Sequence, residues 1–308
     1  MRAAPRSSSM NTSLATTARR MGFGALLLAA SMLASAQQPP APPAPPATGP
    51  AAELRAKLQS LAPQLERNAF RRPLALESSE AADRLSGDVY ALVDHPFARV
   101  SGALREPAAW CQVLMLHLNT KHCAVKGGGS TLAVAIGRKF DQPIADAQAI
   151  AFAYTLGKSD ENYLNVRLSA DTGPLSTRDY SIVFEASPAD GGKTAIHLRY
   201  AYAYGTAARL AMKGYLATLG SDKVGFTPAG QGGYIGGVRG VVERNTMRYY
   251  LAIDSYLDAP GAAQLEQRLA AWFDATEQYA RQLHEIDKSD YLTMKRHEFQ
   301  RLQQPAAS

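Results

Sequence analysis

The chain has 308 residues, of which 46% are hydrophobic and 19% are charged, and its formal net charge at pH 7 is +6. This length allows one large domain or two small ones. Four of the 33 Lys and Arg residues, and none of the 27 Asp and Glu residues, lie in the first 36 positions, so 29 basic side chains face 27 acidic ones in the remainder. The remainder has no basic cluster, and this composition excludes a nucleic-acid partner.

The N-terminal stretch has the pattern of a secretory signal peptide. Arg19 and Arg20 precede a short apolar run at 21–33, and small residues end the segment at Ala36. The run is too short to span a bilayer as a helix. We therefore expect export to the periplasm, cleavage after Ala36 and no transmembrane span in the mature form. Met10 is an alternative start, and the arginine pair leaves a twin-arginine export signal as the lesser option.

A linker and a single domain are predicted to follow. Residues 37–50 contain seven prolines, which predicts an extended tether without a core of its own. No second break in composition and no internal repeat follows, so residues 51–290 are predicted to form one domain. Residues 291–308 are predicted to be a polar tail that frays after about Met294.

The first predicted elements are a helix, two strands and two short helices. One face of an amphipathic helix carries Leu54, Leu58, Leu61 and Leu65, and we expect Pro63 to break or kink it. Residues 73–80 form a candidate edge strand, and residues 87–94 form a second strand. A short helix near Phe97 and another opened by Pro107 come next.

Beyond Cys123 the apolar residues recur at every second position, which is the period of a strand. Turn-forming segments rich in Gly or Asp separate the runs. We therefore predict an antiparallel meander with one apolar face. The predicted strands lie near residues 132–136, 150–156, 164–168, 180–184 and 194–204.

The strand at 194–204 has the most regular pattern in the chain. Its even positions carry Ile196, Leu198, Tyr200, Tyr202 and Tyr204. Three tyrosines on an apolar face form a wall that is hydrophobic and also carries hydroxyl groups. Such a wall favours a ligand cavity, and a packed core with satisfied hydroxyls is the alternative.

The last third of the chain is predicted to be helical, with helices at 206–219 and 238–257 and a further long helix at 262–286. The further helix has one continuous stripe, which consists of Leu265, Leu269, Trp272, Thr276, Tyr279, Leu283 and Ile286.

The block from Gly87 to Trp110, GDVYALVDHPFARVSGALREPAAW, resembles the opening of START-like and polyketide-cyclase-like (SRPBCC) proteins. In those proteins a strand ending near Asp-x-Pro leads into a helix with Val and Leu, and then to a Trp. The resemblance covers roughly residues 73–257. The chain is also similar to uncharacterised exported proteobacterial proteins that share its Trp-Cys and Asn-Thr-Lys-x-Cys segments, which begin here at Trp110 and Asn119.

The resemblance implies an α+β helix-grip fold, in which a curved antiparallel sheet wraps around a long C-terminal helix, here with extra helices at both ends. Proteins of this kind mostly hold lipids, sterols, quinones or other apolar molecules between the sheet and the last helix. This chain departs from the pattern by a helix before the fold, an insertion at about 206–237 and another helix at 262–286. These departures leave the mouth of the pocket undefined.

The predicted ligand-binding residues are those whose side chains would face the space between sheet and helix. Asn245 falls among apolar residues on its helix, so it is either a polar contact inside the cavity or a structural hydrogen-bonding group. A pocket of about 300–1,000 Å³ is expected. The full set is Tyr154, Phe184, Tyr200, Tyr202, Tyr204, Asn245 and Tyr249.

The two cysteines, Cys111 and Cys123, fall in the exported part, where a closely spaced pair favours a disulfide. Two separate buried thiols are the alternative. With His117 and His122 the cysteines could also form a metal set, but the odd spacing of the histidines would place them on opposite sides of a strand. We therefore predict a disulfide and no metal.

Two further segments have a functional and a structural interpretation. The stretch 230–240 leads into a helix N-terminus that could hold a phosphate, but it lacks the P-loop and G-x-G-x-x-G spacings, which favours a hairpin loop. Arg178 and Asp179 are expected to form an ion pair or a turn, with contact to a ligand headgroup as the alternative.

The leading hypothesis is an exported binding or carrier protein for an apolar or amphipathic small molecule, in particular a lipid. The chain has no G-x-S-x-G or H-E-x-x-H motif and no local carboxylate pair suited to acid–base chemistry, and no cofactor is predicted. One alternative is a cyclase, isomerase or hydrolase with a hydrophobic substrate, which predicts a buried titratable group in the pocket. Another is an interaction module that binds an envelope protein partner, which predicts a filled interior.

Overall fold

The computed structural model describes residues 48–206, 222–230 and 232–303, together with residues 209, 210, 214 and 218. These residues belong to one compact unit. The predicted signal peptide, the linker up to residue 47 and most of the predicted helix at 206–219 lie outside the described residues. Within the described ranges, no helix has the length and apolar content needed to cross a membrane.

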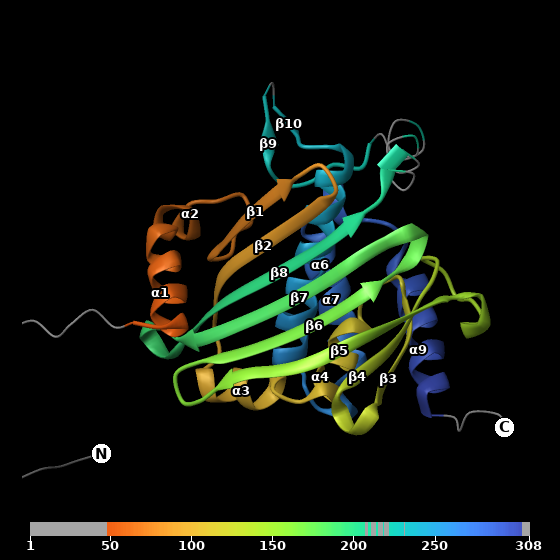
Figure 1. Cartoon of the computed structure of the whole chain (residues 1–308), viewed down its shortest axis with the longest axis horizontal. Coiled ribbons are helices and arrows are strands. Elements are labelled where there is room, and N and C mark those ends of the chain that lie inside the picture. Colours follow the sequence, from red (N-terminus) through yellow and green to blue (C-terminus); the bar gives the residue numbers. More distant parts are fainter. Residues whose placement is uncertain are drawn as a thin grey trace, which may run out of the picture. The chain divides into compact units, whose positions relative to one another are not determined.

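An antiparallel sheet of eight strands forms the centre of the fold (Figure 1). Its order is β1-β2-β8-β7-β6-β5-β4-β3, so the meander predicted for the middle of the chain is confirmed and β1 lies at an edge, as expected. The strands are β1 (Leu74–Glu80), β2 (Arg84–Val93), β3 (Thr120–Lys126), β4 (Thr131–Ile136), β5 (Gln148–Ser159), β6 (Leu164–Thr172), β7 (Thr177–Pro188) and β8 (Thr194–Tyr204).

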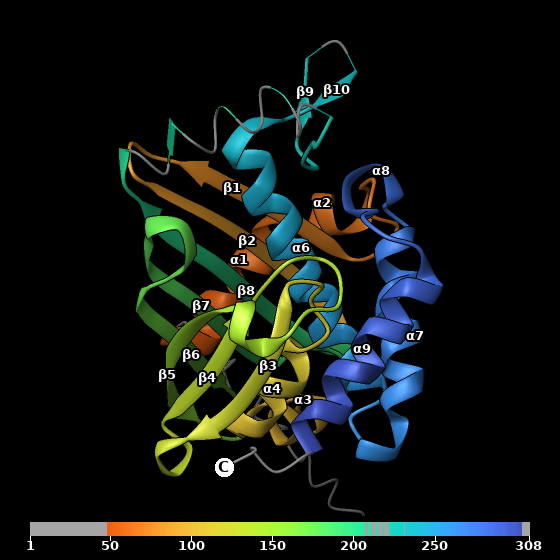
Figure 2. The same ribbon diagram turned by 90° about the vertical axis from the view of Figure 1, so that its right-hand side faces the viewer.

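The long helix α6 (Gly237–Asp258) lies on one face of this sheet, close to the helix predicted there. Figure 2 shows α6 between the sheet and the helices α7 (Leu265–Glu277), α8 (Ala280–Leu283) and α9 (Lys288–Gln303). The predicted α+β helix-grip architecture, with added helices at both ends, is therefore confirmed.

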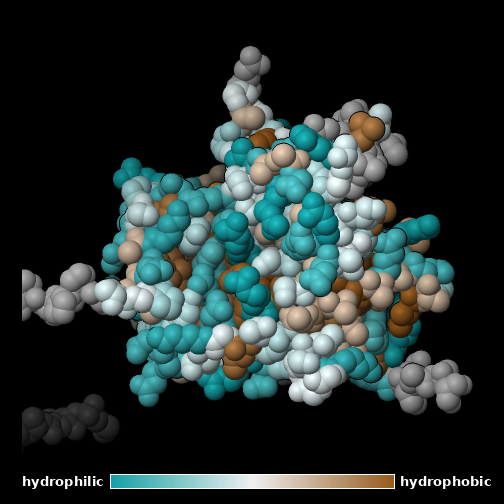
Figure 3. Space-filling view, viewed as in Figure 1, coloured by the Kyte–Doolittle hydropathy of each residue, from teal (hydrophilic) through white to brown (hydrophobic). Residues whose placement is uncertain are grey.

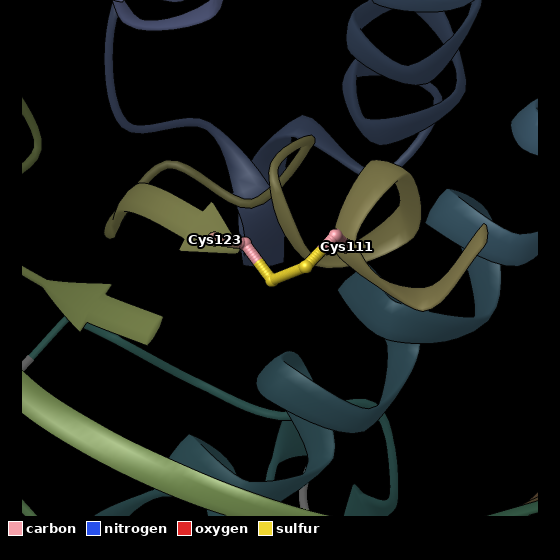
Figure 4. The surroundings of a disulfide bond; sticks show 2 residues. All are labelled: Cys111 and Cys123. Carbon is pink, nitrogen blue, oxygen red and sulfur yellow. A yellow bond between two sulfur atoms is a disulfide. The ribbon is translucent and has the colours of Figure 1, made fainter. Parts of the chain in front are cut away.

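Two short helices connect β2 to β3 and close one end of the core. They are α3 (Phe97–Leu104) and α4 (Pro107–Leu114), and the buried Trp110 indole donates a hydrogen bond to the Leu104 carbonyl at 2.8 Å. A disulfide between Cys111 of α4 and Cys123 of β3 ties the second helix to the sheet, with the Cα atoms 5.3 Å apart (Figure 4). The predicted cysteine pairing is present in the structure.

The opposite face of the sheet is partly covered by the N-terminal helices α1 (Pro50–Ser60) and α2 (Ala62–Glu66). They meet at Leu61, so the break expected near Pro63 is confirmed. Their four leucines pack with Ala75, Tyr163 and Ala195 in a second, smaller apolar cluster. Figure 3, which views this outer face, shows a largely hydrophilic surface with apolar patches toward β5, where alternate alanines are exposed.

The prediction of one long helix at 262–286 is wrong. Helix α7 ends at Glu277, and Tyr279 has non-helical backbone angles before the short α8 begins. The Tyr279 hydroxyl donates a hydrogen bond to the carbonyl of Phe70 at 2.7 Å, and its ring packs edge-on against Phe70 and Phe226. These contacts to distant segments favour the break over continuation of the apolar stripe.

The prediction of a frayed polar tail after about Met294 is also wrong, because these residues belong to α9. Lys295 and Glu298 are fully buried together with Lys121 of β3. Glu298 accepts hydrogen bonds from Lys121 at 2.8 Å and from Lys295 at 2.7 Å. A charge is stable in the interior only when it is paired, and the partner of this polar stretch lies far away in the sequence.

Two short paired strands lie at the glycine-rich stretch, which agrees with the predicted hairpin loop. Strand β9 (Pro228–Ala229) pairs with β10 (Gly233–Tyr234), and α6 begins at Gly237. The expected ion pair of Arg178 and Asp179 is also present at 2.6 Å, and Arg178 contacts Asp83 as well at 3.0 Å.

Candidate functional site

A cavity of about 780 Å³ lies between the sheet and α6. Its volume falls within the expected range for a small-molecule site. Its walls come from strands β2, β4, β5, β7 and β8, from helices α4 and α6, from the segment that leads from α4 into β3, and from the turn that precedes β7.

The tyrosines of β8 form one wall, as their alternation predicts. Tyr200, Tyr202 and Tyr204 all line the cavity, and Tyr180 of β7 joins them. The rings of Tyr180 and Tyr202 are stacked, with centroids 5.4 Å apart. Tyr200 lies 5.2 Å from the ring of Tyr249 on α6, so the aromatic wall continues from the sheet onto the helix.

The hydroxyl groups of this wall remain protonated at neutral pH. Burial raises the pKa of Tyr200 well above its usual value, and the neighbouring tyrosines act in the same direction. Burial also raises the pKa of Tyr202 and Tyr249. The Tyr180 hydroxyl lies 2.7 Å from the Thr177 hydroxyl, whereas the hydroxyls of Tyr200, Tyr202 and Tyr249 have no protein hydrogen bond within the described residues.

The remaining wall is mainly aliphatic. It is formed by side chains of β2, α4, β4 and β5. These side chains are Leu85, Leu114, Val134, Ile136, Ile150 and Phe152. The aliphatic side chains can bury the hydrocarbon part of a ligand, at about 25 cal/mol per Å² of apolar surface removed from water.

Polar groups gather where α6 meets the segment between α4 and β3. His117, Asn119 and Thr120 line the cavity there, opposite Asn245 and Tyr249. The ring of His117 lies 5.2 Å from that of Tyr249. Its Nδ1 accepts a hydrogen bond from the backbone N–H of Asn119 at 3.2 Å, so a neutral ring carries its proton on Nε2.

Burial lowers the pKa of His117 well below its usual value, and the nearby charges of Arg248, Lys295 and Lys139 lower it further. The imidazole is therefore neutral at physiological pH. Its Nε2 is buried without a hydrogen-bond partner among the described residues. The side chain of Asn245 acts in the opposite direction and raises the pKa of His117, but the positions of the two side chains do not satisfy hydrogen-bond geometry.

Five of the seven residues predicted to bind a ligand line the cavity, namely Tyr200, Tyr202, Tyr204, Asn245 and Tyr249. Two do not. Tyr154 of β5 turns toward the end of α3, where its hydroxyl donates a hydrogen bond to the carbonyl of Arg105. Phe184 of β7 is fully buried and packs edge-on against Trp110, with centroids 5.7 Å apart, because α4 covers that part of the sheet.

Sequence reasoning missed Tyr180, although it shares the two-residue period of Ile182 and Phe184 and could have been found from it. It considered His117 only as a metal ligand. The segment around His117 has no regular period, so nothing in the sequence indicated which way its side chain would face. Within the described ranges, no group of three or more His, Cys, Asp or Glu side chains is arranged to hold a metal ion.

The cavity is open beside the turn between β6 and β7. Leu175 lines the cavity and is 71% exposed, so it marks the mouth. Leu175 and Ser176 both have positive φ angles, 55° and 61°, a strained backbone for residues other than glycine.

No family model matches the chain, and no curated protein matches it. Three similar solved structures all have helix-grip folds. Human StAR-related lipid transfer protein 5 has a TM-score of 0.34 and 8% identity, over 68% of this chain and 96% of that chain. The protein Ara h 8.0201 has a TM-score of 0.34 and 11% identity, over 59% and 98% of the respective chains.

The third structure is norcoclaurine synthase from Thalictrum flavum, with a TM-score of 0.32 and 10% identity, over 60% of this chain and 87% of that chain. At such low identities and TM-scores, no activity or ligand is carried over from these proteins. The residues and the size of the cavity are therefore the basis for assigning a function to this chain.

Proposed function

We propose that this chain is an exported START-like protein that binds and carries an apolar or amphipathic small molecule, in particular a lipid, between the sheet and α6. The observation that carries the proposal is the open cavity of about 780 Å³ with aliphatic and tyrosine walls. An interaction module with a filled interior is disfavoured by the same observation.

The size of the cavity argues that something occupies it. By the cost of cavities in protein cores, about 24 cal/mol per Å³, even about 300 Å³ of dry void would cost about 7 kcal/mol. That equals the whole net stability of many domains, about 5–15 kcal/mol. The cavity therefore holds water against its hydroxyls or holds a ligand, and its aliphatic walls favour the ligand.

Native mass spectrometry of the protein purified from its own periplasm tests the proposal directly. We expect an adduct whose organic extract contains an apolar molecule. Tyr202→Ala should reduce the adduct while circular dichroism stays unchanged, because the variant removes one ring from the wall. Val241→Trp should block the cavity from α6, and Val125→Trp, at an exposed site outside the cavity, serves as the matched control.

An empty wild-type protein that also binds no apolar probe in vitro would remove the basis for the proposal. Equal retention by Val241→Trp and Val125→Trp would place the ligand outside this cavity.

The export part of the proposal has its own test. N-terminal sequencing of the mature protein should begin at Gln37, the residue after the predicted cleavage site. Retention in the inner membrane after a carbonate wash would contradict cleavage. Cleavage at this site would also support the proposed similarity to exported proteobacterial proteins.

An enzyme acting on a hydrophobic substrate is the second candidate, and His117 is the observation that favours it. A buried titratable group with a strongly shifted pKa faces the cavity beside Tyr249. Its Nδ1 already accepts a backbone hydrogen bond, so the neutral ring has no free basic nitrogen, and it can only polarise a substrate by donating a hydrogen bond from Nε2. Turnover of the extracted ligand by wild type and not by His117→Ala would favour the enzyme.

A further inference from the structure

The polar groups that reach the cavity are all uncharged. Among its lining residues in the described part of the chain, none is Asp, Glu, Lys or Arg. Burial raises the pKa of Tyr200 and Tyr249 and lowers that of His117, so these side chains are neutral at physiological pH. The cavity offers hydrogen-bonding groups and no counter-charge.

The uncharged groups at the end formed by α6 and the segment before β3 include one unpaired donor, the N–H of His117, and two hydroxyls that can donate. The neutral His117 ring carries its proton on Nε2, because Nδ1 accepts the N–H of Asn119 at 3.2 Å. This Nε2 has no partner among the described residues. The hydroxyls of Tyr249 and Tyr200 also have no protein partner among the described residues, but they line the cavity and can bind water or a ligand. An unpaired buried donor is costly, so an acceptor atom on the ligand would stabilise this end.

The charges behind this end are positive overall, although each cation contacts a carboxylate, because four cations share Glu285 and two share Glu298. Lys139 and Arg248 lie 2.6 and 2.9 Å from Glu285, and Lys295 lies 2.7 Å from Glu298. Burial is the main cause of the lowered pKa of His117, and these three cations lower it further, so a ligand ammonium at this end would be repelled. None of them lines the cavity, so a ligand carboxylate would lose its hydration without gaining an ion pair.

We propose that the cavity selects an uncharged ligand whose polar end is a hydrogen-bond acceptor, such as an ester or ketone carbonyl, and that it discriminates against carboxylates and amines on the same hydrocarbon. This inference rests on the proposed binding function and specifies the class of molecule bound. The acceptor oxygen lies at the end formed by His117, Tyr200, Asn245 and Tyr249, and the hydrocarbon lies along the aliphatic wall.

Three probes with the same alkyl chain test the selectivity of the mature protein at neutral pH: methyl decanoate, decanoate and decylammonium, each competing with an uncharged naphthalene dye. We expect methyl decanoate to displace the dye at a concentration at least about tenfold lower than either charged probe, because burying an unpaired charge is costly. Binding of decanoate or decylammonium as tight as that of the ester would overturn the inference and leave the binding function intact. If the dye and all three probes fail to bind, the proposed function itself fails.

A charge placed in the wall provides a second readout. Val241 lines the cavity and is only partly buried, so a longer side chain can be accommodated there. Val241→Lys should strengthen the binding of decanoate relative to that of methyl decanoate. The uncharged control Val241→Met should keep the wild-type preference for the ester. An unchanged ratio in a folded Val241→Lys protein would contradict selection by charge.

The acceptor position is tested by removing one hydroxyl. Tyr249→Phe should reduce the affinity for methyl decanoate by about threefold to tenfold, which is the range for the loss of one hydrogen bond. Tyr256→Phe is the matched control, because Tyr256 is also buried on α6 but does not line the cavity. If both variants, Tyr249→Phe and Tyr200→Phe, fold and bind the ester as tightly as wild type, the acceptor oxygen of the ligand does not lie at this end.

Discussion

On the outer face of the sheet, a histidine and two acidic residues from three neighbouring strands form a cluster. His197 of β8 lies 2.8 Å from Asp88 and 2.7 Å from Glu185, on the strands to either side. Its ring stacks on Tyr90 with centroids 4.4 Å apart. Burial alone would lower the pKa of His197, but the hydrogen bonds and charges of the two carboxylates raise it.

The raised pKa predicts a pH-dependent stability. The protonated ring stabilises the folded protein fully below its unfolded-state pKa, about 6.5, and this contribution is lost as pH rises through the folded-state pKa. His197→Gln should lower the free energy of unfolding at about pH 6 by about 1.5–3 kcal/mol, as for hydrogen bonds to charged groups. Urea denaturation at several pH values measures this effect. The exposed His284→Gln is the control, and equal pH profiles for wild type and His197→Gln would contradict the prediction.

At the scale of elements, the contact between β2 and α6 depends on a glycine. A Cβ atom at Gly87 would lie 2.3 Å from the Thr246 hydroxyl oxygen and 3.1 Å from its Cβ. Because Thr246 is fully buried, it has no room to move away. The glycine therefore sets how closely the helix approaches the sheet, and so one dimension of the cavity.

Gly87→Ala should destabilise the protein by about 1–3 kcal/mol, the usual cost of overpacking. Thr246→Ala in the same chain should recover part of the loss, because it removes the hydroxyl that the new methyl group would meet. A double-mutant cycle from urea denaturation gives the coupling. If the two substitutions are additive, the steric explanation is wrong.

The disulfide belongs to the same scale, because it connects α4 to β3 across 12 positions of the sequence. Replacing both Cys111 and Cys123 by Ser should remove about 3 kcal/mol of stability by the chain-entropy model. For a domain of this size that corresponds to a fall in Tm of about 6–12 °C. Calorimetry of the variant, and of wild type under reducing conditions, should give the same shift. An unchanged Tm in both would refute a stabilising bridge.

At the scale of the whole molecule, Glu285 joins four segments that are distant in the chain. Its carboxylate accepts hydrogen bonds from Lys223 at 2.9 Å and from Arg248 at 2.9 Å, and it also contacts Lys139 and Arg244. Burial by itself would raise the pKa of Glu285, but the charge of Arg248 and the two lysines lower it to about 2.

The lowered pKa predicts acid sensitivity. The contribution of Glu285 is present above its unfolded-state pKa of about 4.5 and is lost as pH falls from there toward about 2. Glu285→Gln should cost about 3 kcal/mol at neutral pH and flatten the acid limb of the stability curve. Glu266→Gln, which breaks an exposed pair with Arg296, should cost less than about 1 kcal/mol. Equal effects of the two substitutions would show that burial does not strengthen this cluster.

The sequence by itself determined the elements whose pattern is local. The two-residue period predicts the meander and the inward side of Tyr200, Tyr202 and Tyr204, since alternate side chains of a strand share a face wherever the strand lies. The spacing of the cysteines and their predicted export indicated the disulfide in the same way. These inferences need no knowledge of distant partners.

Only the tertiary structure decided what faces each surface. Phe184 follows the inward period but packs on Trp110, because α4 covers that part of the sheet. The polar stretch after Met294 is a buried helix because Glu298 pairs with Lys121, 177 positions earlier. His117 reaches the cavity from a segment with no period at all. In each case the deciding energy comes from a contact between residues far apart in the chain, which a local pattern does not encode.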